Sequence, residues 1–557
     1  MQPVLQGGIN LISVAPPSLL GRKTAPQANN PNTPFSMRFL GLFSAGNLKP
    51  WRNSNNCKGR NQAMNDTKVH LAIDLGGSSG RIIAGFVNNG KLQLEQVHRF
   101  TNDAVWIQDS LQWNLTQLWQ EILLGLRTAS ERYPNIASVG VDSWGVDYVL
   151  LDQQDLFAGP ARTYRDPRTV GILEKAYEIV PREEIFSTTG IQFMVINSLY
   201  QLLAARLADE SSLKIADGFL MIGDCFHWLL TGKRSIEATN ASTSQLIDPQ
   251  TKTWSDDLIE RFGLPRHIFM DVIEPGSTLG PVQPSVASVT GLEDVPVVVP
   301  ATHDTASAVL SVPVNDFAPS KPTWCYISSG TWSLMGCELS EPKVNSLCSE
   351  LNFTNEGGVG GSTRLLKNIG GLWVFQQIRK SLERQGNPPS WEEMVTAAES
   401  AEPFTLLVNP DDPSLVAPED MITAITELAE RTGQDCPSDH SVLFRAALEG
   451  LAMRYRVCLE MLESLTENRI DTIHIVGGGS QNHLLCQMTA DACNRTVIAG
   501  PVEATAIGNV MMQMIGTGSL DSVASGRVLV RQSFETEQFE PQNPDAWTEP
   551  SKRFAAL

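Results

Sequence analysis

Short apolar runs, turns and stretches of helical spacing alternate along the chain from residue 70 onward. In two places an apolar run breaks into a turn of Gly, Ser and Thr and then resumes, at residues 70–81 (HLAIDLGGSSGR) and 325–336 (CYISSGTWSLMG). Each pattern predicts a strand, a turn and a strand. Glycine permits close approach of backbone to a ligand, and consecutive N–H groups in such a turn can bind an anion. The pair of turns suggests two halves that close on one polyphosphate.

Three further segments predict alternating strands and helices. Residues 139–151 have the pattern of a strand, a turn and a strand, and residues 297–309 that of a strand leading into a helix. Residues 472–482 run from a strand into a glycine-rich turn, which helical spacing of apolar residues follows. This alternation is typical of mixed α/β layers. The Pro-rich stretch 312–323 is the best candidate for a domain boundary.

The length of 557 residues exceeds what a single hydrophobic core supports. We therefore expect an N-terminal domain at residues 66–311, a C-terminal domain at 312–540 and a tail at 541–557. The formal net charge of −19 argues against nucleic acid as the main partner, because phosphate backbones are held largely by Lys and Arg. No apolar run is long enough for a membrane span, so no membrane partner is expected.

Residues 1–65 differ in composition from the rest. They contain seven Lys and Arg residues and no Asp or Glu, and they are rich in Asn, Pro, Gly and Ser without a sustained period. This composition favours a disordered or artefactual leader over a targeting signal. A transit peptide would fit the acid-poor composition but lacks a clear amphipathic helix, and translation starting at Met64 is a third reading. The nine scattered cysteines, with no CxxC pair, indicate a reducing compartment, and we expect a cytoplasmic protein.

Asp74 ends the first apolar run, directly before the first glycine turn. A carboxylate beside a phosphate-binding turn would repel the phosphate unless a hard cation lay between them, and Mg²⁺ is the usual cation in such sites. An Asx turn or a cap at the strand end is the structural alternative, and it is the better reading of an isolated Asp-x-Gly. The presence of the second glycine turn favours the magnesium interpretation of Asp74 over the structural one.

Asp304 follows His303 and precedes a good helix-forming segment. The structural reading is a helix N-cap, a position that Asp fills readily. The functional reading is a general base at the end of a buried strand, able to accept the proton of an attacking hydroxyl. The place of Asp304 between the two glycine turns in the sequence favours the functional reading only modestly.

Aromatic and charged residues gather at two places in the first half, in the segments SWGVD and YRDPRT. An aromatic face with carboxylates and guanidinium groups is a common way to hold a polyhydroxylated ligand, but ordinary surface ion pairs use the same residues and are the more frequent case. The residues concerned are Trp144, Asp147, Arg165, Asp166 and Arg168. No GxxxxGK[ST] motif is present, so ATP, if it binds, does not bind through a P-loop.

A series of short segments resembles the FGGY carbohydrate kinases of the actin/hexokinase/Hsp70-like superfold. The segments share one register from about Val69 to Val530, and such a series is far more specific than any single motif. They lie at residues 74–81, 141–152, 189–193, 239–243, 329–336, 354–358, 366–373 and 500–504. Within the family they are most similar to the branch that phosphorylates L-rhamnulose.

The resemblance implies a role for individual residues. Asp304 matches the catalytic base that deprotonates the primary hydroxyl of the sugar, and the family's counterpart of Asp74 belongs to the magnesium and phosphate region. The positions matching ATP contacts are Gly77, Ser78, Ser79, Gly80, Arg81, Thr331, Gln376 and Gly478. The positions matching substrate contacts are Gly145, His303, Asp304, Thr305 and Asn368. Gly77 stands where alanine is common in the family, which should be harmless in a turn.

The implied fold is α/β, with two ribonuclease-H-like domains of the actin-like ATPase type around a cleft. The implied reaction converts ATP and L-rhamnulose to ADP and L-rhamnulose 1-phosphate, with Mg²⁺, in a monomer or small homo-oligomer. Another FGGY kinase, acting on L-fuculose or xylulose, is the nearer alternative. The farther alternative is a chaperone-like or filament-forming ATPase, which would need neither a catalytic base nor a sugar site.

Overall fold

The computed structural model describes residues 67–557 except Asn387 and Ala417. The predicted leader at residues 1–65 lies outside the described residues. Two large mixed sheets dominate the described chain, and both predicted turns join antiparallel neighbours within them. The prediction of a two-domain α/β protein is therefore confirmed at the level of the fold, whereas the exact domain boundaries stay a prediction.

The first sheet has the strand order β11-β12-β6-β1-β2-β3. Its central strand β1 is buried along its whole length and pairs antiparallel with β2 on one side and parallel with β6 on the other. Such a strand, covered on both faces, reads in sequence as a nearly continuous apolar run. The strands are β1 (Val69–Leu75), β2 (Ser79–Asn88), β3 (Lys91–Thr101), β6 (Ile136–Ser143), β11 (Thr278–Pro281) and β12 (Pro296–Val298).

The second sheet repeats this arrangement. Its order is β15-β16-β14-β13-β17-β18-β19, and β13 pairs antiparallel with β14 and parallel with β17, as β1 does with β2 and β6. The repeat explains why the same strand-turn-strand pattern occurs twice in the sequence. The strands are β13 (Trp324–Ser329), β14 (Trp332–Leu339), β15 (Thr354–Gly357), β16 (Thr363–Gly370), β17 (Thr472–Val476), β18 (Thr496–Ala499) and β19 (Glu537–Phe539).

Three two-stranded ribbons complete the strands of the described chain. They pair β4 (Ala104–Ile107) with β5 (Ser110–Trp113), β7 (Tyr148–Leu151) with β8 (Gly218–Met221), and β9 (Ile247–Asp248) with β10 (Thr253–Trp254). The β7 strand is the second strand expected within residues 139–151. Residues 312–323, the expected boundary, contain neither helix nor strand.

Helices cover both sheets. Those before the expected boundary are α2 (Leu115–Arg132), α3 (Ile172–Ile179), α4 (Arg182–Thr189), α5 (Ser198–Leu207), α6 (Ser211–Ile215), α7 (Ile222–Thr231), α8 (Ala238–Ala241), α9 (Asp256–Arg261), α10 (Pro284–Thr290) and α11 (Asp304–Leu310). Those after it are α12 (Ser346–Glu350), α13 (Trp373–Arg384), α14 (Trp391–Ser400), α15 (Met421–Arg431), α16 (His440–Thr466), α17 (His483–Cys493), α18 (Ala504–Gly516), α19 (Val523–Ser533) and α20 (Thr548–Phe554). No helix of the described chain is both long and apolar enough to cross a membrane.

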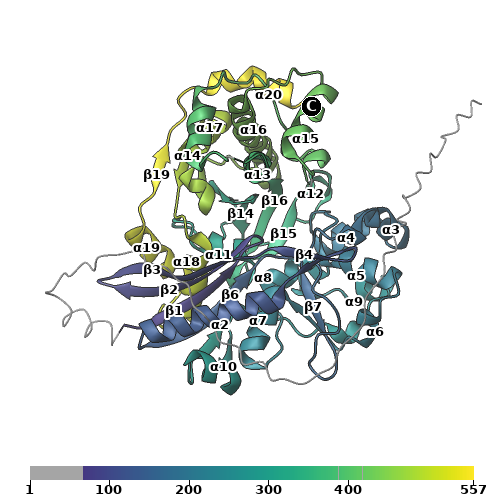
Figure 1. Cartoon of the computed structure of the whole chain (residues 1–557), viewed down its shortest axis with the longest axis vertical. Helices are drawn as coiled ribbons and strands as arrows, with labels where there is room; N and C mark the ends of the chain where they lie inside the picture. The colour runs from purple at the N-terminus through teal and green to yellow at the C-terminus, as the bar shows by residue number, and fades with distance from the viewer. Residues whose placement is uncertain (1–66, 387, 417) are drawn as a thin grey trace, which may run out of the picture. The chain divides into compact units, whose positions relative to one another are not determined.

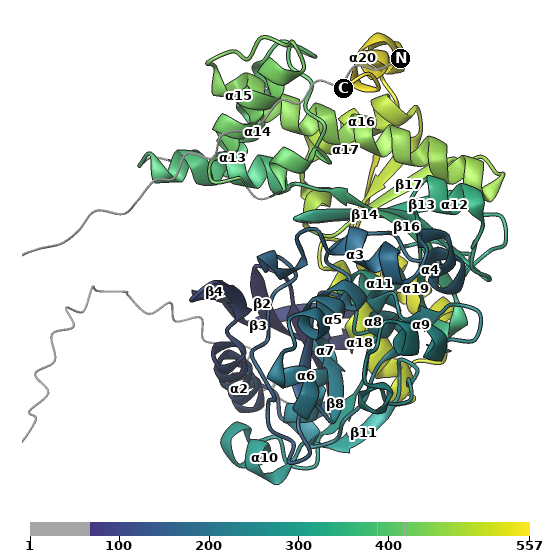
Figure 2. The same ribbon diagram turned by 90° about the vertical axis from the view of Figure 1, so that its right-hand side faces the viewer.

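Two late helices return to the first sheet. Apolar residues of α18 form one buried cluster with Ala72 of β1, Ile83 of β2 and Ala306 of α11, and Figure 1 shows α18 and α19, in yellow, beside the purple strands β1–β3. Helices α13 to α17 and α20 gather over the second sheet (Figure 2). The tail expected at 541–557 forms part of this layer, because Trp547 and Phe554 are buried. Segments far apart in the sequence thus meet beside β1.

Candidate active site

The first predicted turn, Gly76 to Ser78, joins β1 to β2. The backbone N–H of Gly76 donates to the carbonyl of Ser79 at 2.9 Å, and Asn102 closes the turn from outside by donating to the Gly76 carbonyl at 2.8 Å. A Cβ on Gly77 would meet nothing closer than the Tyr164 hydroxyl at 3.6 Å, so the alanine common in the family would fit here. A Cβ on Gly80 would lie 2.3 Å from the Phe100 ring. Packing therefore requires glycine at Gly80 but not at Gly77.

The second predicted turn, Gly330 and Thr331, joins β13 to β14 and is tied to the start of α13. The Leu372 N–H donates to the Gly330 carbonyl at 3.0 Å and the Trp373 N–H to the Thr331 carbonyl at 3.2 Å. The Thr331 hydroxyl donates to the Gln376 side chain at 3.3 Å. Two of the predicted ATP contacts, far apart in sequence, are thus in direct contact.

Gly478 lies in the glycine-rich turn that follows β17, next to the second turn. A Cβ on Gly479 would lie 2.0 Å from the Ser329 hydroxyl and one on Gly477 would lie 3.1 Å from the Ser329 carbonyl, whereas a Cβ on Gly478 would meet nothing within 4 Å. Gly477 also has a positive φ of 84°. Packing against Ser329 therefore requires glycine at Gly479, and the positive φ favours glycine at Gly477. Gly478, between them, borders open space.

Asp74, the predicted metal residue, is buried and paired with Arg81. The two residues face each other across β1 and β2, and the Arg81 guanidinium donates to the Asp74 carboxylate at 2.5 Å. The same guanidinium also pairs with Glu503, which directly precedes α18. Arg81, expected to contact ATP, therefore links the first turn to a segment more than four hundred residues away.

Asp142 is a site residue that the sequence analysis did not single out. It lies on β6 directly beside Asp74 on β1 and has no solvent exposure. Its Oδ2 accepts a hydrogen bond from the Asn509 side chain at 2.5 Å, but its Oδ1 has no partner in the described chain. Burial raises the pKa of Asp142 well above its usual value, and the Asp74 and Asp304 carboxylates add to this effect. Two sequence signals could have pointed to it: its position next to the end of the apolar run of β6 and its place in segment 141–152, which resembles the FGGY kinases.

Asp304, the predicted base, is the first residue of α11 rather than its N-cap, a position that His303 occupies. The alternative reading of Asp304 as the N-cap is therefore wrong, although Asp304 Oδ1 does accept the N–H of Thr305 at 2.6 Å. Its side chain remains 32% exposed. Burial raises the pKa of Asp304, and the nearby Asp74 carboxylate acts in the same direction, while His303 opposes it. A carboxylate of this kind can accept a proton near neutral pH more readily than a fully solvated one.

His303 contacts a buried ion pair of the second sheet, formed by Arg364 and Glu356. Its Nδ1 lies 3.1 Å from the Arg364 guanidinium and 3.3 Å from the Glu356 carboxylate, and its Nε2 lies 3.4 Å from Asp304 Oδ1. Arg364 and Glu356 are both buried and pair at 3.1 Å. Burial alone would raise the pKa of Glu356, but Arg364 and His303 hold that pKa below its usual value. The imidazole next to the base is thereby fixed in orientation.

Gly145, another predicted substrate contact, lies close to His303. A Cβ on Gly145 would lie 3.3 Å from His303 Nε2 and 3.1 Å from the Thr243 hydroxyl. The next residue, Val146, has a φ of 67°, which is strained for a β-branched residue. The Val146 N–H donates to Thr243 at 3.0 Å, and its carbonyl accepts from the Ser198 hydroxyl at 2.6 Å. Strain held in this way is frequent at functional sites.

Asn368 lies on β16, the strand that also carries Arg364. Both its backbone N–H and its side-chain amide donate to the Gln192 side chain, at 3.0 and 3.1 Å. Thr305, the remaining predicted substrate contact, is buried behind Asp304. Asn368 and Thr305 are therefore placed by contacts within the protein, and no hydrogen bond within the described chain joins these two residues to each other.

The proposed sugar-binding cluster in SWGVD and YRDPRT is mostly structural. Asp147 is completely buried and accepts from the indoles of Trp113 at 2.6 Å and Trp144 at 3.0 Å. Burial raises the pKa of Asp147 to about 6, although these hydrogen bonds lower it. Asp166 is also buried and caps the short helix at Pro167–Thr169. Asp147 and Asp166 are buried and accept hydrogen bonds from the protein itself, so their carboxylates are not available to bind a sugar. Arg165 is exposed.

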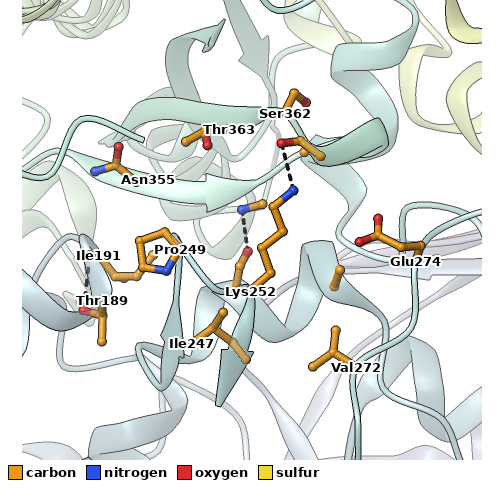
Figure 3. Close-up of a pocket in the computed structure, with 15 residues that line it drawn as sticks. Thr189, Ile191, Ile247, Pro249, Lys252, Val272, Glu274, Asn355, Ser362 and Thr363 are labelled. Atoms are coloured by element: carbon orange, nitrogen blue, oxygen red, sulfur yellow. Dashed lines mark hydrogen bonds between the residues drawn. The ribbon is translucent and has the colours of Figure 1, made fainter. Parts of the chain in front are cut away.

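A separate pocket lies where segments of the two predicted domains meet, as Figure 3 shows. Its lining includes Thr189 and Lys252 from the first and Asn355 and Thr363 from the second, and Lys252 donates to the Gly361 carbonyl at 3.0 Å. Its volume of about 40 Å³ leaves room for a few water molecules. The pocket contains none of the predicted site residues and is too small for a sugar or a nucleotide.

Comparisons with known proteins agree with this architecture. Residues 69–311 match the N-terminal domain and residues 325–517 the C-terminal domain of the FGGY family of carbohydrate kinases. A rhamnulokinase from Bacteroides thetaiotaomicron is 42% identical over 86% of this chain and 96% of its own length. One from Oceanobacillus iheyensis is 40% identical over 84% of this chain and 97% of its own length.

Solved structures show the same fold at low sequence identity. A gluconate kinase from Lactobacillus acidophilus superposes with a TM-score of 0.72 at 16% identity, covering 88% of this chain and 97% of that one. A xylulose kinase from the same organism gives a TM-score of 0.71 at 15% identity, covering 88% and 96%. With both family domains present in order and relatives matched over most of their length, the chain belongs to the FGGY family of carbohydrate kinases.

Proposed function

We propose that this carbohydrate kinase transfers the terminal phosphoryl group of ATP to O1 of L-rhamnulose, a step of L-rhamnose degradation. The names of the relatives that match over most of the chain support the choice of ketose. The observation that carries the chemistry is the Asp304 carboxylate, which is partly exposed, free of any Arg or Lys partner in the described chain, and adjacent to His303 and to the Asp74 and Asp142 carboxylates.

Asp304 serves as the general base in this proposal. The O1 hydroxyl of the ketose gives its proton to Asp304 while O1 forms a bond to the terminal phosphorus, and the bond from that phosphorus to the bridging oxygen of ADP breaks. The backbone N–H groups of the two turns, around Gly77 and Thr331, face the charge of the phosphate chain. Positioning and electrostatic stabilisation supply most of the catalysis in such transfers. We assign Gly145, His303, Thr305 and Asn368 to the sugar.

Asp74 and Asp142 suit a magnesium ion that accompanies ATP. Mg²⁺ is commonly held by one or two carboxylates together with waters and phosphate oxygens, and the unpartnered Oδ1 of buried Asp142 is a ligand of that kind. The described chain contains no cluster of three or more metal-ligating side chains, which agrees with a cation held partly by its substrate. When bound, the ion neutralises charge on the phosphate chain.

The test is a coupled assay of ADP release over a panel of ketoses that contains L-rhamnulose, L-fuculose and L-xylulose. The proposal expects the highest kcat/KM with L-rhamnulose and little ADP release without sugar. A preference for another ketose would favour a different FGGY kinase, and equal ATP turnover with and without sugar would favour a non-kinase ATPase. Either result contradicts the proposal.

A cytoplasmic location and a monomeric or small homo-oligomeric state also stay proposals. Gel filtration of the purified protein tests the oligomeric state.

A further inference from the structure

Arg165 lies between two aromatic rings that come from different parts of the chain. Its guanidinium carbon is 4.8 Å from the centre of the Tyr164 ring and 5.1 Å from that of the Trp373 ring. The residue is exposed, and its guanidinium makes neither a hydrogen bond nor an ion pair with any part of the chain that the structure describes. A guanidinium that stacks through its faces keeps its N–H donors available at its edge.

The backbone around Arg165 is anchored to buried groups. The Tyr164 N–H donates to Asp147 at 3.2 Å and the Arg165 N–H to the Thr163 hydroxyl at 3.1 Å. The following residue, Asp166, accepts the backbone N–H of Leu111 at 2.8 Å. The backbone that carries the Arg165 side chain is therefore fixed before a ligand binds. Binding then costs less conformational entropy than it would on a mobile loop.

Each of the two rings lies beside one of the two glycine-containing turns, the first around Gly77 and the second around Thr331. The Tyr164 hydroxyl is the nearest atom to a Cβ built on Gly77, at 3.6 Å. Trp373 donates its backbone N–H to the Thr331 carbonyl at 3.2 Å, and its indole donates to the Leu415 carbonyl at 3.0 Å. Burial raises the pKa of the Tyr164 phenol, while Arg165 and the Trp332 side chain lower it, which again places Tyr164 between the turns.

Other arginines of the site are already paired. Arg81 binds Asp74 and Glu503, and Arg364 binds Glu356. Arg165 is thus an arginine adjacent to both turns with unsatisfied donors. A ketose is neutral, so in the proposed reaction the anionic group that such a fork recognises is a phosphate.

We propose that Arg165 binds the phosphoryl group while it passes from ATP to the ketose. This inference rests on the proposed function. The transition state spreads negative charge over the three equatorial oxygens of the phosphoryl group, and a guanidinium fork from the same chain stabilises that charge. The O1 to phosphorus bond forms, the bond to ADP breaks and the O1 proton goes to Asp304, so Arg165 keeps its own protons throughout.

Arg165→Ala and Arg165→Lys test the inference. We expect Arg165→Ala to lower kcat by about 100-fold or more, since a catalytic arginine of this kind contributes roughly 10³ to 10⁵ in rate, with the KM for ATP changed less than about threefold. Arg165→Lys should lower kcat at least about tenfold, because a point charge does not replace a fork. Millimolar guanidinium chloride should restore part of the activity of Arg165→Ala.

Arg182→Ala is the matched control. Arg182 also stacks on an aromatic ring, with its guanidinium carbon 4.2 Å from the Phe193 ring centre, and it also crosses between the predicted domains by donating to Ser349 at 3.2 Å. A role in holding the domains together would affect both variants alike. We expect Arg182→Ala to keep kcat within about threefold of the wild type, because the contacts that Arg182 makes with Phe193 and Ser349 involve neither of the two turns.

A second measurement separates this inference from the function itself. Intrinsic tryptophan fluorescence should report at least about tenfold weaker binding of ADP with aluminium fluoride to Arg165→Ala, with binding of ADP alone unchanged. The inference is overturned if Arg165→Ala retains wild-type kcat, if Arg182→Ala loses as much, or if ADP with aluminium fluoride binds equally well. Should Arg165→Ala fail to fold, the same criteria apply to Arg165→Lys. A wild-type protein without ketose-dependent ADP release would instead refute the proposed function.

Discussion

Gly508 of α18 lies directly against Ser307 of α11, so closely that a Cβ on Gly508 would come within 1.8 Å of the Ser307 carbonyl oxygen. The contact brings a helix from the end of the chain against the short helix that begins with Asp304. The position of the proposed base therefore depends on a residue two hundred positions away.

Gly508→Ala should displace α11 and lower both stability and turnover. Overpacking of a tight contact costs about 1–3 kcal/mol in the free energy of unfolding, which chemical denaturation measures. Thr505→Ala on the same helix is the control, because Thr505 is only partly buried. Equal stability and kcat for Gly508→Ala and the wild type would contradict the prediction.

Alanine at Gly77, in the first turn, and alanine at Gly80, at the start of β2, should behave differently although the two residues are only three positions apart. A Cβ at Gly77 makes an ordinary contact at 3.6 Å, whereas one at Gly80 would lie 2.3 Å from Phe100. We expect Gly77→Ala to keep stability within about 0.5 kcal/mol and Gly80→Ala to lose about 1–3 kcal/mol. Thermal unfolding monitored by circular dichroism compares them, and equal melting temperatures would refute the packing argument.

Asp304→Asn should lower kcat by orders of magnitude with little change in the affinity for ATP. The amide cannot accept the O1 proton, whereas the nucleotide is expected to bind elsewhere. Because burial raises the pKa of Asp304, the acidic limb of the pH profile of kcat should lie above the usual range of an aspartate, activity being lost as the pH falls through that pKa. Steady-state kinetics and nucleotide titration measure both quantities, and near-normal turnover would remove Asp304 from the mechanism.

Asp142→Asn should raise the magnesium concentration needed for half-maximal activity by about tenfold or more, because it replaces one oxygen of the carboxylate whose Oδ1 has no protein partner. Asp248→Asn is the control, because the Asp248 carboxylate closes a local turn by accepting the backbone N–H groups of Gln250 and Thr251. Magnesium titrations of the ADP-release assay at saturating ATP provide the comparison. The same requirement in both variants would separate Asp142 from the metal.

Asp147 should make the stability of the protein depend on pH. Its pKa is raised to about 6 in the fold and is about 3.9 in the unfolded chain, so the folded state holds more protons between these values and its stability falls as the pH rises across them. The advantage of the wild type over Asp147→Asn should thus shrink by about 1–3 kcal/mol between pH 4 and pH 7. Urea denaturation at several pH values measures it, and a constant difference would show that Asp147 does not titrate there.

Parts of the site could be predicted because they depend on neighbours in sequence. Asp74 and the turn after it follow from an apolar run that stops at a glycine pair, and β1 and β2 form around that turn. Asp147 shows the limit of such reasoning, because a carboxylate beside tryptophans has the same local pattern whether it faces a sugar or is buried beneath the surface. Its burial, with both indoles donating to it, identifies it as structural.

Local sequence determined the two strand-turn-strand units, the strand leading to Asp304 and the glycine-rich turn at Gly478, because backbone preferences and apolar periodicity act over a few residues. Tertiary structure alone decided that Asn509 holds Asp142, that Glu503 pairs with Arg81, and that Arg165 lies on Trp373. The partners in these pairs are separated by about two hundred to more than four hundred residues. Burial of α18 against the first sheet and the attachment of the start of α13 to the second turn bring them together, and no local pattern records which distant partner a side chain will meet.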